Sequence, residues 1–237
     1  MTYDNKVIFV SGANRGIGKA IVEALLKHNV QKVYAAARHL ENLSFQDARV
    51  VPVQLDITNP VQVRNAAQLA QDTDILINNA GALAFAPIVA GKIDDIVSDM
   101  QVNFFGTVNM IQSFAPVIEK KGGGAIANLI SIVGLAPMVG AAGYCASKSA
   151  LFSATQAMRT ELKPKHISVH GIFPGPIDTR MAKDFNFPKA SADITAENII
   201  GGIAAGHEDI FPDPMSKDLS QLWAKNPKDL EKQFATM

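Results

Sequence analysis

The chain contains little cysteine, no excess of charge of one sign and no long apolar run. Its one cysteine, Cys145, cannot form an intramolecular disulfide, which excludes a disulfide-framework fold. Lys plus Arg and Asp plus Glu both number 22, so the net charge is zero and no basic stripe indicates a nucleic-acid partner. No apolar run approaches the roughly 20 residues of a membrane span, and the N-terminus shows no secretion signal. We therefore expect a cytoplasmic protein with no nucleic-acid or membrane partner.

The 237 residues, 48% of them hydrophobic, are enough to bury one large core. Apolar runs of strand length alternate with helical periodicity, which predicts a parallel sheet with right-handed crossovers. We expect one α/β domain over residues 1–237, doubly wound, with helices on both faces of the sheet in three α/β/α layers. Within it we expect a substrate loop over about 176–205 and a C-terminal tail over about 212–237. The expected strands are Lys6–Val10, Gln31–Ala37, Arg49–Val53, Asp74–Ile77, Ala125–Ile130, Ile167–Phe173 and a very short Asp209–Phe211. The expected helices are Gly16–His28, Val61–Ala70, Ile93–Ile118 with Pro116 near its end, Tyr144–Leu162, Thr195–Ala205 and a surface helix in the charged tail.

A glycine-rich turn follows the first expected strand and opens the first expected helix. It reads Ser11-Gly12-Ala13-Asn14-Arg15-Gly16-Ile17-Gly18. Glycine lets the backbone approach a pyrophosphate, and the helix N-terminus supplies N–H groups and a positive dipole end. The spacing G-x-x-x-G-x-G differs from G-x-G-x-x-G, and a turn that only packs the helix on the strand is the alternative. Its placement between strand and helix favours dinucleotide binding.

The end of the second expected strand lacks the carboxylate that NAD sites place against the ribose 2′-hydroxyl. Arg38 stands there instead, and Arg15 in the glycine turn adds a second cation. A guanidinium can bind a 2′-phosphate through two hydrogen bonds, whereas a carboxylate would repel it. We therefore predict NADP(H) as the cofactor, with NAD as the alternative.

Tyr144 and Lys148 lie one turn apart on the same face of an expected helix. A nearby ammonium stabilises the phenolate and lowers the pKa of a tyrosine toward the range in which an acid/base catalyst works. Ser131 follows the fifth expected strand, and in open α/β sheets the ligand crevice lies beyond the carboxyl ends of the strands. The same edge receives Asn78-Asn79-Ala80-Gly81 and Pro174-Gly175. These motifs are therefore expected to converge on one crevice.

Together these residues resemble the short-chain dehydrogenase/reductase family in its compact single-domain form. The matching features, in the family's order along the chain, are Gly12, Gly16, Gly18, Asn78-Asn79-Ala80-Gly81, Asn103, Ser131, Tyr144-Cys145-Ala146-Ser147-Lys148 and Pro174-Gly175. The resemblance implies a Rossmann-like fold and a nicotinamide-dependent oxidoreductase. One mild departure is Ser11, where family members most often have threonine.

The resemblance also implies a role for each matching residue. Ser131 orients the substrate oxygen, Tyr144 exchanges a proton with it, and Lys148 holds the nicotinamide ribose and lowers the tyrosine pKa. Asn103 supports a water of the proton relay, Asp56 holds the adenine, and Thr179 bonds the carboxamide. The expected catalytic residues are Asn103, Ser131, Tyr144 and Lys148. The expected cofactor-binding residues are Gly12, Asn14, Arg15, Gly16, Ile17, Gly18, Arg38, Asp56, Ile57, Asn79, Ala80, Gly81, Tyr144, Lys148, Pro174, Gly175, Ile177 and Thr179.

The C-terminal segment departs from the pattern of tetrameric family members, which commonly end in a Gly-rich strand. Here Pro212 and Pro214 lack the N–H that a strand ladder needs. We therefore expect a homodimer made by the long helices, with a tetramer as the alternative.

Apolar residues that fall near the substrate end of the expected crevice suggest an apolar pocket, with a loop as its lid. About half of them are expected to be ordinary core. They are Leu83, Val133, Leu135, Met138, Val139, Met181, Phe185 and Phe187. No charged residue is aimed at the reacting centre, which favours a small to medium hydrophobic ketone, aldehyde or secondary alcohol, as for a carbonyl reductase or alcohol dehydrogenase.

The histidines lack metal-ligand spacing, so we expect no metal, and we expect Cys145 to be buried and inert. An NAD-preferring alcohol dehydrogenase and a non-catalytic dinucleotide-sensing or scaffold protein remain as alternatives.

Overall fold

The computed structural model describes residues 1–184 and 186–236 of the chain. A seven-stranded sheet forms its centre, with strand order β3-β2-β1-β4-β5-β6-β7 and every neighbouring pair parallel. The strand order reverses between β1 and β4, the point at which open α/β sheets bind ligands. The doubly wound parallel sheet predicted from the sequence is therefore confirmed. The strands are β1 (Val7–Ser11), β2 (Lys32–Ala37), β3 (Val50–Gln54), β4 (Ile75–Asn78), β5 (Gly124–Leu129), β6 (Ile167–Ile172) and β7 (Asp209–Ile210).

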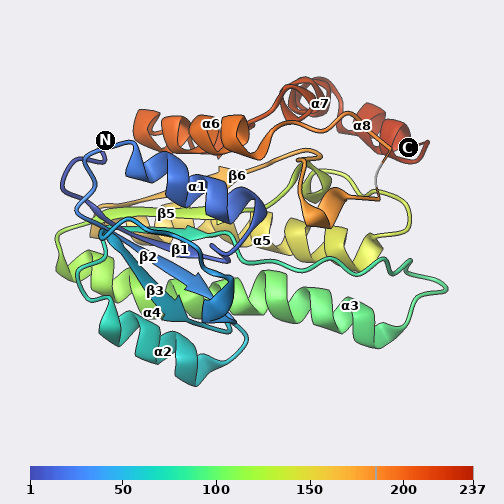
Figure 1. The fold of residues 1–237 in the computed structure, drawn as a ribbon. Helices are drawn as coiled ribbons and strands as arrows, with labels where there is room; N and C mark the ends of the chain where they lie inside the picture. Colours follow the sequence, from blue (N-terminus) through green and yellow to red (C-terminus); the bar gives the residue numbers. More distant parts are fainter. Residues whose placement is uncertain (185, 237) are drawn as a thin grey trace.

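Helices cover both faces of the sheet, which makes three layers (Figure 1). The α-helices are α1 (Gly16–Leu26), α2 (Pro60–Leu69), α3 (Ile93–Met100), α4 (Thr107–Lys120), α5 (Ala142–Leu162), α6 (Ala192–Ala205), α7 (Pro214–Lys225) and α8 (Pro227–Phe234). Short 3₁₀ turns are η1 (Leu40–Asn42), η3 (Ile132–Gly134), η4 (Lys163–Lys165) and η5 (Arg180–Ala182), and η2 (Gln101–Gly106) is a π-helix.

The core is divided by the sheet because successive strand residues point to opposite faces. Ile8 and Val10 of β1 pack with α1 and α6, whereas Val7 and Phe9 pack with α2, α4 and the end of α5. Phe9 lies against the fully buried Phe114 of α4, with ring centroids 4.6 Å apart. Strands buried on both faces need a continuous apolar run, which is why the sequence pattern located them.

The strands start and end within one or two residues of their predicted bounds, but the predicted long helix Ile93–Ile118 is interrupted. It consists of α3, the π-helix η2 and α4, and Pro116 lies inside α4. The π-helix surrounds Asn103, whose side-chain amide hydrogen-bonds both the N–H and the C=O of Ala82. Such π segments are frequent at functional sites, and this one has a tertiary partner that helical periodicity does not reveal.

The C-terminal tail was predicted to be surface helix, and this is only half correct. Leu219, Leu230 and Phe234 of α7 and α8 are buried in one cluster with Ile132 and Cys145. Asp213 starts α7 with a capping box, and its other carboxylate oxygen accepts a 2.8 Å hydrogen bond from the N–H of Gly175. The tail is therefore docked onto the carboxyl edge of the sheet.

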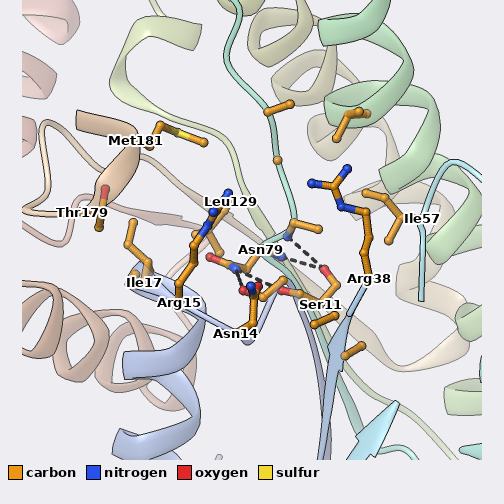
Figure 2. Close-up of a pocket in the computed structure, with 18 of the residues that line it drawn as sticks. Ser11, Asn14, Arg15, Ile17, Arg38, Ile57, Asn79, Leu129, Thr179 and Met181 are labelled. Carbon is orange, nitrogen blue, oxygen red and sulfur yellow. Dashed lines mark hydrogen bonds between the residues drawn. The ribbon is translucent and has the colours of Figure 1, made fainter. Parts of the chain in front are cut away.

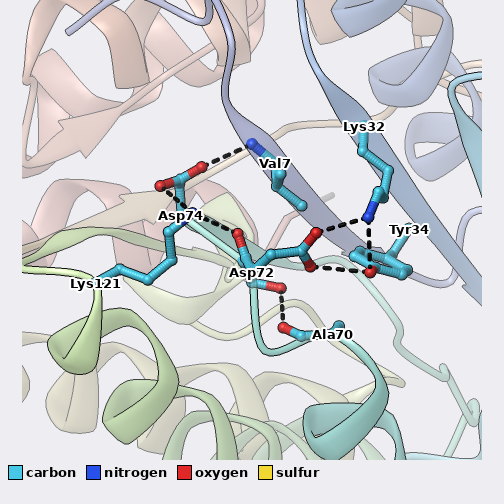
Figure 3. A network of polar contacts seen from close by, with 8 residues as sticks. Val7, Lys32, Tyr34, Ala70, Asp72, Asp74 and Lys121 are labelled. Atoms are coloured by element: carbon cyan, nitrogen blue, oxygen red, sulfur yellow. Dashed lines mark hydrogen bonds and ion pairs between the residues drawn. The ribbon is translucent and has the colours of Figure 1, made fainter.

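The opposite, amino edge of the sheet has a closed polar network (Figure 3). Asp72 accepts hydrogen bonds from Lys32 (2.6 Å) and from the hydroxyl of Tyr34 (2.9 Å). Asp74 accepts from the N–H of Val7 (2.8 Å) and pairs with Lys121 (2.9 Å). These charged groups therefore have partners within the chain.

Candidate active site

In the glycine turn between β1 and α1, the backbone lies in close contact with itself and with the segment after β4. Gly12 has φ +66°, and a Cβ there would lie 2.8 Å from the Cα of Ala80. A Cβ on Gly18 would lie 2.3 Å from the carbonyl oxygen of Gly12. The turn therefore requires glycine at both positions, to bring the segment after β4 and the start of α1 against the end of β1.

Asn79 and Ser11 fasten this turn to the segment that follows β4 (Figure 2). The Asn79 amide nitrogen donates to the carbonyls of Ser11 and Gly12, 3.0 Å in each case. The backbone N–H groups of Asn79 and Ala80 both donate to Ser11 Oγ at 3.1 Å. Asn79 thus positions the glycine turn, a contact that the sequence interpretation did not include, and Ser11 supplies the hydroxyl that this contact needs.

A cleft of about 280 Å³ lies over this turn at the carboxyl edge of the sheet. Most of the predicted cofactor-binding residues line it. They are Gly12, Asn14, Arg15, Gly16, Ile17, Arg38, Asp56, Ile57, Asn79, Ala80, Gly81, Tyr144, Lys148, Pro174 and Thr179. Of the other predicted site residues, Ser131, Gly175 and Ile177 line a neighbouring cavity, while Gly18 and Asn103 line neither.

Arg15 and Arg38 are exposed cations of this cleft, on either side of the Ser11–Asn79 contact (Figure 2). Within the described residues neither guanidinium forms an ion pair with a carboxylate. Asp56 also lines the cleft, and its Oδ1 accepts from the N–H and the hydroxyl of Thr58, at 2.9 and 2.7 Å. Two cations, a helix N-terminus and a glycine turn form a donor set that fits the phosphates of a dinucleotide.

Lys148 lies almost fully buried on α5, with 4% of its surface exposed. Its Nζ donates a 2.8 Å hydrogen bond to the carbonyl of Leu129 at the end of β5, and lies 5.6 Å from the ring centroid of Tyr144. Ser131, just beyond β5, donates through Oγ to the carbonyl of Pro174 at 3.3 Å. Strand β5 and helix α5 thereby bring the phenol, the ammonium and the hydroxyl to one edge.

Burial changes the acidity of this pair in opposite directions. It lowers the pKa of Lys148 to about 8, because the ammonium loses water, while the carboxylate of Asp99 opposes the change. Burial raises the pKa of Tyr144, and the nearby Ser131 hydroxyl opposes that shift. The sequence predicted a lowered tyrosine pKa, so the direction in the structure is the reverse, because desolvation of the phenolate has the largest effect.

Asn103 is fully buried and has partners on both atoms of its amide. Oδ1 accepts from the N–H of Ala82, and Nδ2 donates to the carbonyl of Ala82 and to Ser147 Oγ, each at 2.9 Å. A Cβ on Gly81 would lie 3.1 Å from Asn103 Oδ1 and 3.7 Å from Lys148 Nζ. Asn103 therefore lies beside the ammonium and joins the segment after β4 to α5.

A second cavity of about 120 Å³ adjoins the cleft, and Tyr144 lines both. Of the residues predicted for an apolar pocket, Leu83, Val133, Met138, Met181 and Phe187 line it. Leu135 and Val139 do not, because Leu135 packs in the core and Val139 is exposed to solvent. Phe185 lies outside the described residues.

Sequence reasoning missed several residues of this cavity, above all Met215 of α7 and Phe234 of α8. The signal that was available is the amphipathic spacing of Leu230 and Phe234 in the charged tail. Their position over the cavity could not be read from that spacing. Cys145 is buried, as predicted, and burial raises the pKa of its thiol, so the position is that of an unreactive cysteine.

Two negative findings concern the described part of the chain. No group of three or more His, Cys, Asp and Glu side chains there is arranged to hold a metal ion. None of its helices combines the length and apolar character that crossing a membrane requires.

Comparison with known proteins agrees with this geometry. The family model described as short chain dehydrogenase matches residues 6–189. An NADP-dependent 3-hydroxy acid dehydrogenase of Schizosaccharomyces pombe is 32% identical over 209 residues, covering 82% of this chain and 81% of the relative. The chain therefore belongs to the short-chain dehydrogenase/reductase family of oxidoreductases.

Solved structures show the same fold. A short-chain dehydrogenase from Burkholderia cenocepacia, crystallised in complex with NADP, superimposes with a TM-score of 0.94 at 36% identity, covering 99% of both chains. A short-chain dehydrogenase/reductase from Burkholderia phymatum in complex with NAD has a TM-score of 0.84 at 22% identity, covering 96% of both chains. At this identity, the similarity to the B. phymatum structure shows only a shared fold.

Proposed function

We propose that this chain is an NADP(H)-dependent oxidoreductase that interconverts a neutral apolar ketone or aldehyde and the corresponding alcohol. The observation that carries the proposal is the position of Tyr144, which lines both the glycine-turn cleft and the apolar cavity. A phenol at that boundary can exchange a proton with a substrate oxygen. When bound in the cleft, NADP(H) would supply the hydride for reduction, or accept it for oxidation, at C4 of its nicotinamide.

The residues of the chain bind the substrate, orient its oxygen and transfer the proton. Ser131 lines the apolar cavity and orients the substrate oxygen toward Tyr144. Lys148 lies in the cleft with a pKa of about 8, lowered by burial, so it is mostly an ammonium at neutral pH. In that state it favours the phenolate form of Tyr144 during proton transfer. Asn103 holds the Ala82 backbone beside this ammonium.

The preference for NADP(H) over NAD(H) is supported by Arg15 and Arg38. Both line the cleft without a carboxylate partner among the described residues, so both are available to a 2′-phosphate. The relative from S. pombe is named as NADP-dependent, and the structure from B. cenocepacia contains NADP.

A neutral substrate is supported by the lining of the second cavity. In the described chain its lining contains no Asp, Glu, Lys, Arg or His side chain, and its polar side chains are those of Ser131, Tyr144 and Thr179. A carboxylate there would lose water without gaining a cation. We therefore propose that the substrate class differs from the 3-hydroxy acids named for the S. pombe relative.

The test is NADPH oxidation by the purified protein with a panel of neutral ketones and aldehydes, 3-oxo acids and sugar phosphates. Turnover of neutral ketones that is lost in Tyr144→Phe supports the proposal. Activity confined to carboxylates or sugar phosphates contradicts the substrate class. Faster turnover with NADH indicates an NAD-preferring enzyme. Tight NADPH binding without turnover of any compound indicates a dinucleotide sensor or scaffold.

We also propose a homodimer made by the long helices, in the cytoplasm. Ile93 and Val97 of α3 and Phe105 of the adjoining η2 expose large apolar side chains that a second copy could cover. Strand β7 has only two residues, and Pro212 and Pro214 follow it, which disfavours assembly through this edge. Sedimentation of wild type against Val97→Glu tests the dimer, since a charge in the interface should give monomers.

A further inference from the structure

Asp99, at the end of α3, is a buried acid that the proposed reaction does not use. Only 1% of its surface is exposed. Oδ1 accepts a 3.0 Å hydrogen bond from the N–H of Ala84, whereas Oδ2 is buried with no hydrogen-bond partner among the described residues. A buried carboxylate oxygen without a partner is costly, so its presence needs an explanation.

Asp99 lies among residues of the proposed active site. It lies one helical turn before Asn103, and the two side chains hold the N–H groups of Ala84 and Ala82 in the same segment. Helix α3 packs against α5, the helix of Tyr144 and Lys148 (Figure 1). A Cβ on Gly143 would lie 3.0 Å from the Cα of Ile96, so the two helices approach closely where α5 begins.

Burial raises the pKa of Asp99, whereas the N–H of Ala84 and the ammonium of Lys148 oppose that shift. Few charged and titratable groups act on this carboxyl. On its own helix there is Asp95, which is exposed and of like sign. On α5 there are Lys148, of opposite sign, and the ionisable Tyr144 and Cys145. Asp99 is in turn the charged residue that acts on Lys148 in the described chain. Lys148 and Asp99 form no direct ion pair, so they act on each other through space.

We propose that Asp99 is a positioning residue whose buried carboxylate is the counter-charge that keeps Lys148 an ammonium within the cleft. Either charge alone would be expensive to bury, and opposite charges in a region of low dielectric offset part of that cost. The effect of Asp99 on turnover rests on the proposed function, whereas its electrostatic coupling to Lys148 does not.

The first test compares the pH profiles of kcat/KM for wild type, Asp99→Asn and the control Asp94→Asn, an exposed acid on the same helix. Asparagine keeps an acceptor for the N–H of Ala84, removes the charge and replaces the other oxygen with an NH2 group of similar size. We expect the alkaline limb of Asp99→Asn to move to lower pH by about one unit, because Lys148 then loses its proton more readily. The limb of Asp94→Asn should stay in place. An unmoved limb in an active Asp99→Asn enzyme would overturn the proposal.

The second test needs no activity, so it separates failure of this inference from failure of the proposed function. It is a thermal unfolding cycle of wild type, Asp99→Asn, Lys148→Met and the double variant at pH 7. The double variant should unfold about 4 °C above the value expected from adding the two single changes, since it leaves no unpaired buried charge. Additive changes, or a double variant that does not fold, would overturn the proposal.

Discussion

The described part of the chain places a tyrosine, a lysine and an aspartate near one another at each of two opposite edges of the sheet: Tyr34, Lys32 and Asp72 at one, and Tyr144, Lys148 and Asp99 at the other. At the amino edge, Lys32 lies 5.0 Å from the ring centroid of Tyr34, and both donate hydrogen bonds to Asp72 (Figure 3). At the carboxyl edge, Lys148 lies 5.6 Å from the ring centroid of Tyr144 but donates to a backbone carbonyl. The two lysines thus lie at similar distances from a tyrosine ring, but one donates its hydrogen bond to a carboxylate and the other to a backbone carbonyl.

The two lysines differ in their exposure to water and in their hydrogen-bond partners. A side-chain hydrogen bond to Asp72 raises the pKa of Lys32, whose side chain is 31% exposed. Burial lowers the pKa of Lys148 to about 8. The first group stabilises its own charges, whereas the second leaves a carboxylate oxygen of Asp99 without a hydrogen-bond partner in the part of the chain that the structure describes. Groups of the second kind are candidates for function, because they retain the capacity to bind a ligand or move a proton.

The largest expected effect is the loss of turnover when the phenol at the carboxyl edge is removed. Tyr144→Phe should lower kcat/KM on the order of 10³-fold, because the acid/base is lost while the ring remains. The matched control Tyr34→Phe removes a phenol of the amino edge and should stay within about twofold of wild type. Steady-state NADPH oxidation measures both. Retention of more than a tenth of wild-type kcat/KM by Tyr144→Phe would remove the functional distinction between the two edges.

The cations of the two edges should also differ. Arg49 is held by a bidentate contact with Asp47, at 3.0 and 2.8 Å. Arg38 lines the cleft and has no such partner among residues 1–184 and 186–236. Arg38→Asp should lower the ratio of kcat/KM for NADPH over NADH about 10²-fold, because a charge-assisted contact with a 2′-phosphate becomes a repulsion. The control is Arg64→Asp, an exposed arginine of α2. Equal ratios in Arg38→Asp and wild type would argue against NADP selection by this residue.

The pH dependence of stability should separate the two lysines. The pKa of Lys148 is lowered by burial from 10.5 to about 8, so between these values the unfolded chain binds more protons and stability rises with pH. From pH 7 to 9.5, wild type should gain about 2 kcal/mol in unfolding free energy relative to Lys148→Met. The pKa of Lys32 is raised, chiefly by Asp72, so wild type and Lys32→Met should keep a constant difference. Urea unfolding at several pH values measures this. Parallel curves for all three proteins would contradict the assignment.

The smallest expected effect concerns the boundary of the apolar cavity. Phe234 lines it, whereas Leu230, one turn earlier on α8, is buried without lining it. Phe234→Leu should lower kcat/KM for a bulky neutral ketone about tenfold and leave KM for NADPH unchanged. Leu230→Val, a change of similar size in the same helix, should leave both constants unchanged. Equal effects of the two variants would mean that α8 acts only through stability.

Some of the site could be predicted because its residues sit in local patterns. Gly12, Gly16 and Gly18 mark the turn between a strand and a helix, and parallel strands place all their carboxyl ends at one edge. Tyr144 and Lys148 share a helix face by spacing alone. The structure brings Gly12, Gly16, Tyr144 and Lys148 to one cleft, whereas Gly18 packs against Gly12 beside it.

Other features depend on contacts between segments that are distant in sequence. Asp99 looks like any acid of a charged helix until α5 and the segment after β4 bury it. Phe234 belongs to a tail that was predicted to lie on the surface, but it lines the cavity. Asp213 anchors that tail through the N–H of Gly175, and the buried cluster of α7 and α8 holds it in place.

Periodicity and turn chemistry are local properties, so they were enough to predict the parallel sheet, the glycine turn and the edge where the site lies. The burial of particular charges, the direction in which the pKa of Tyr144 moves and the helices that enclose the second cavity depend instead on how distant segments pack. Desolvation depends on every atom that surrounds a group, and those atoms come from segments far apart along the chain.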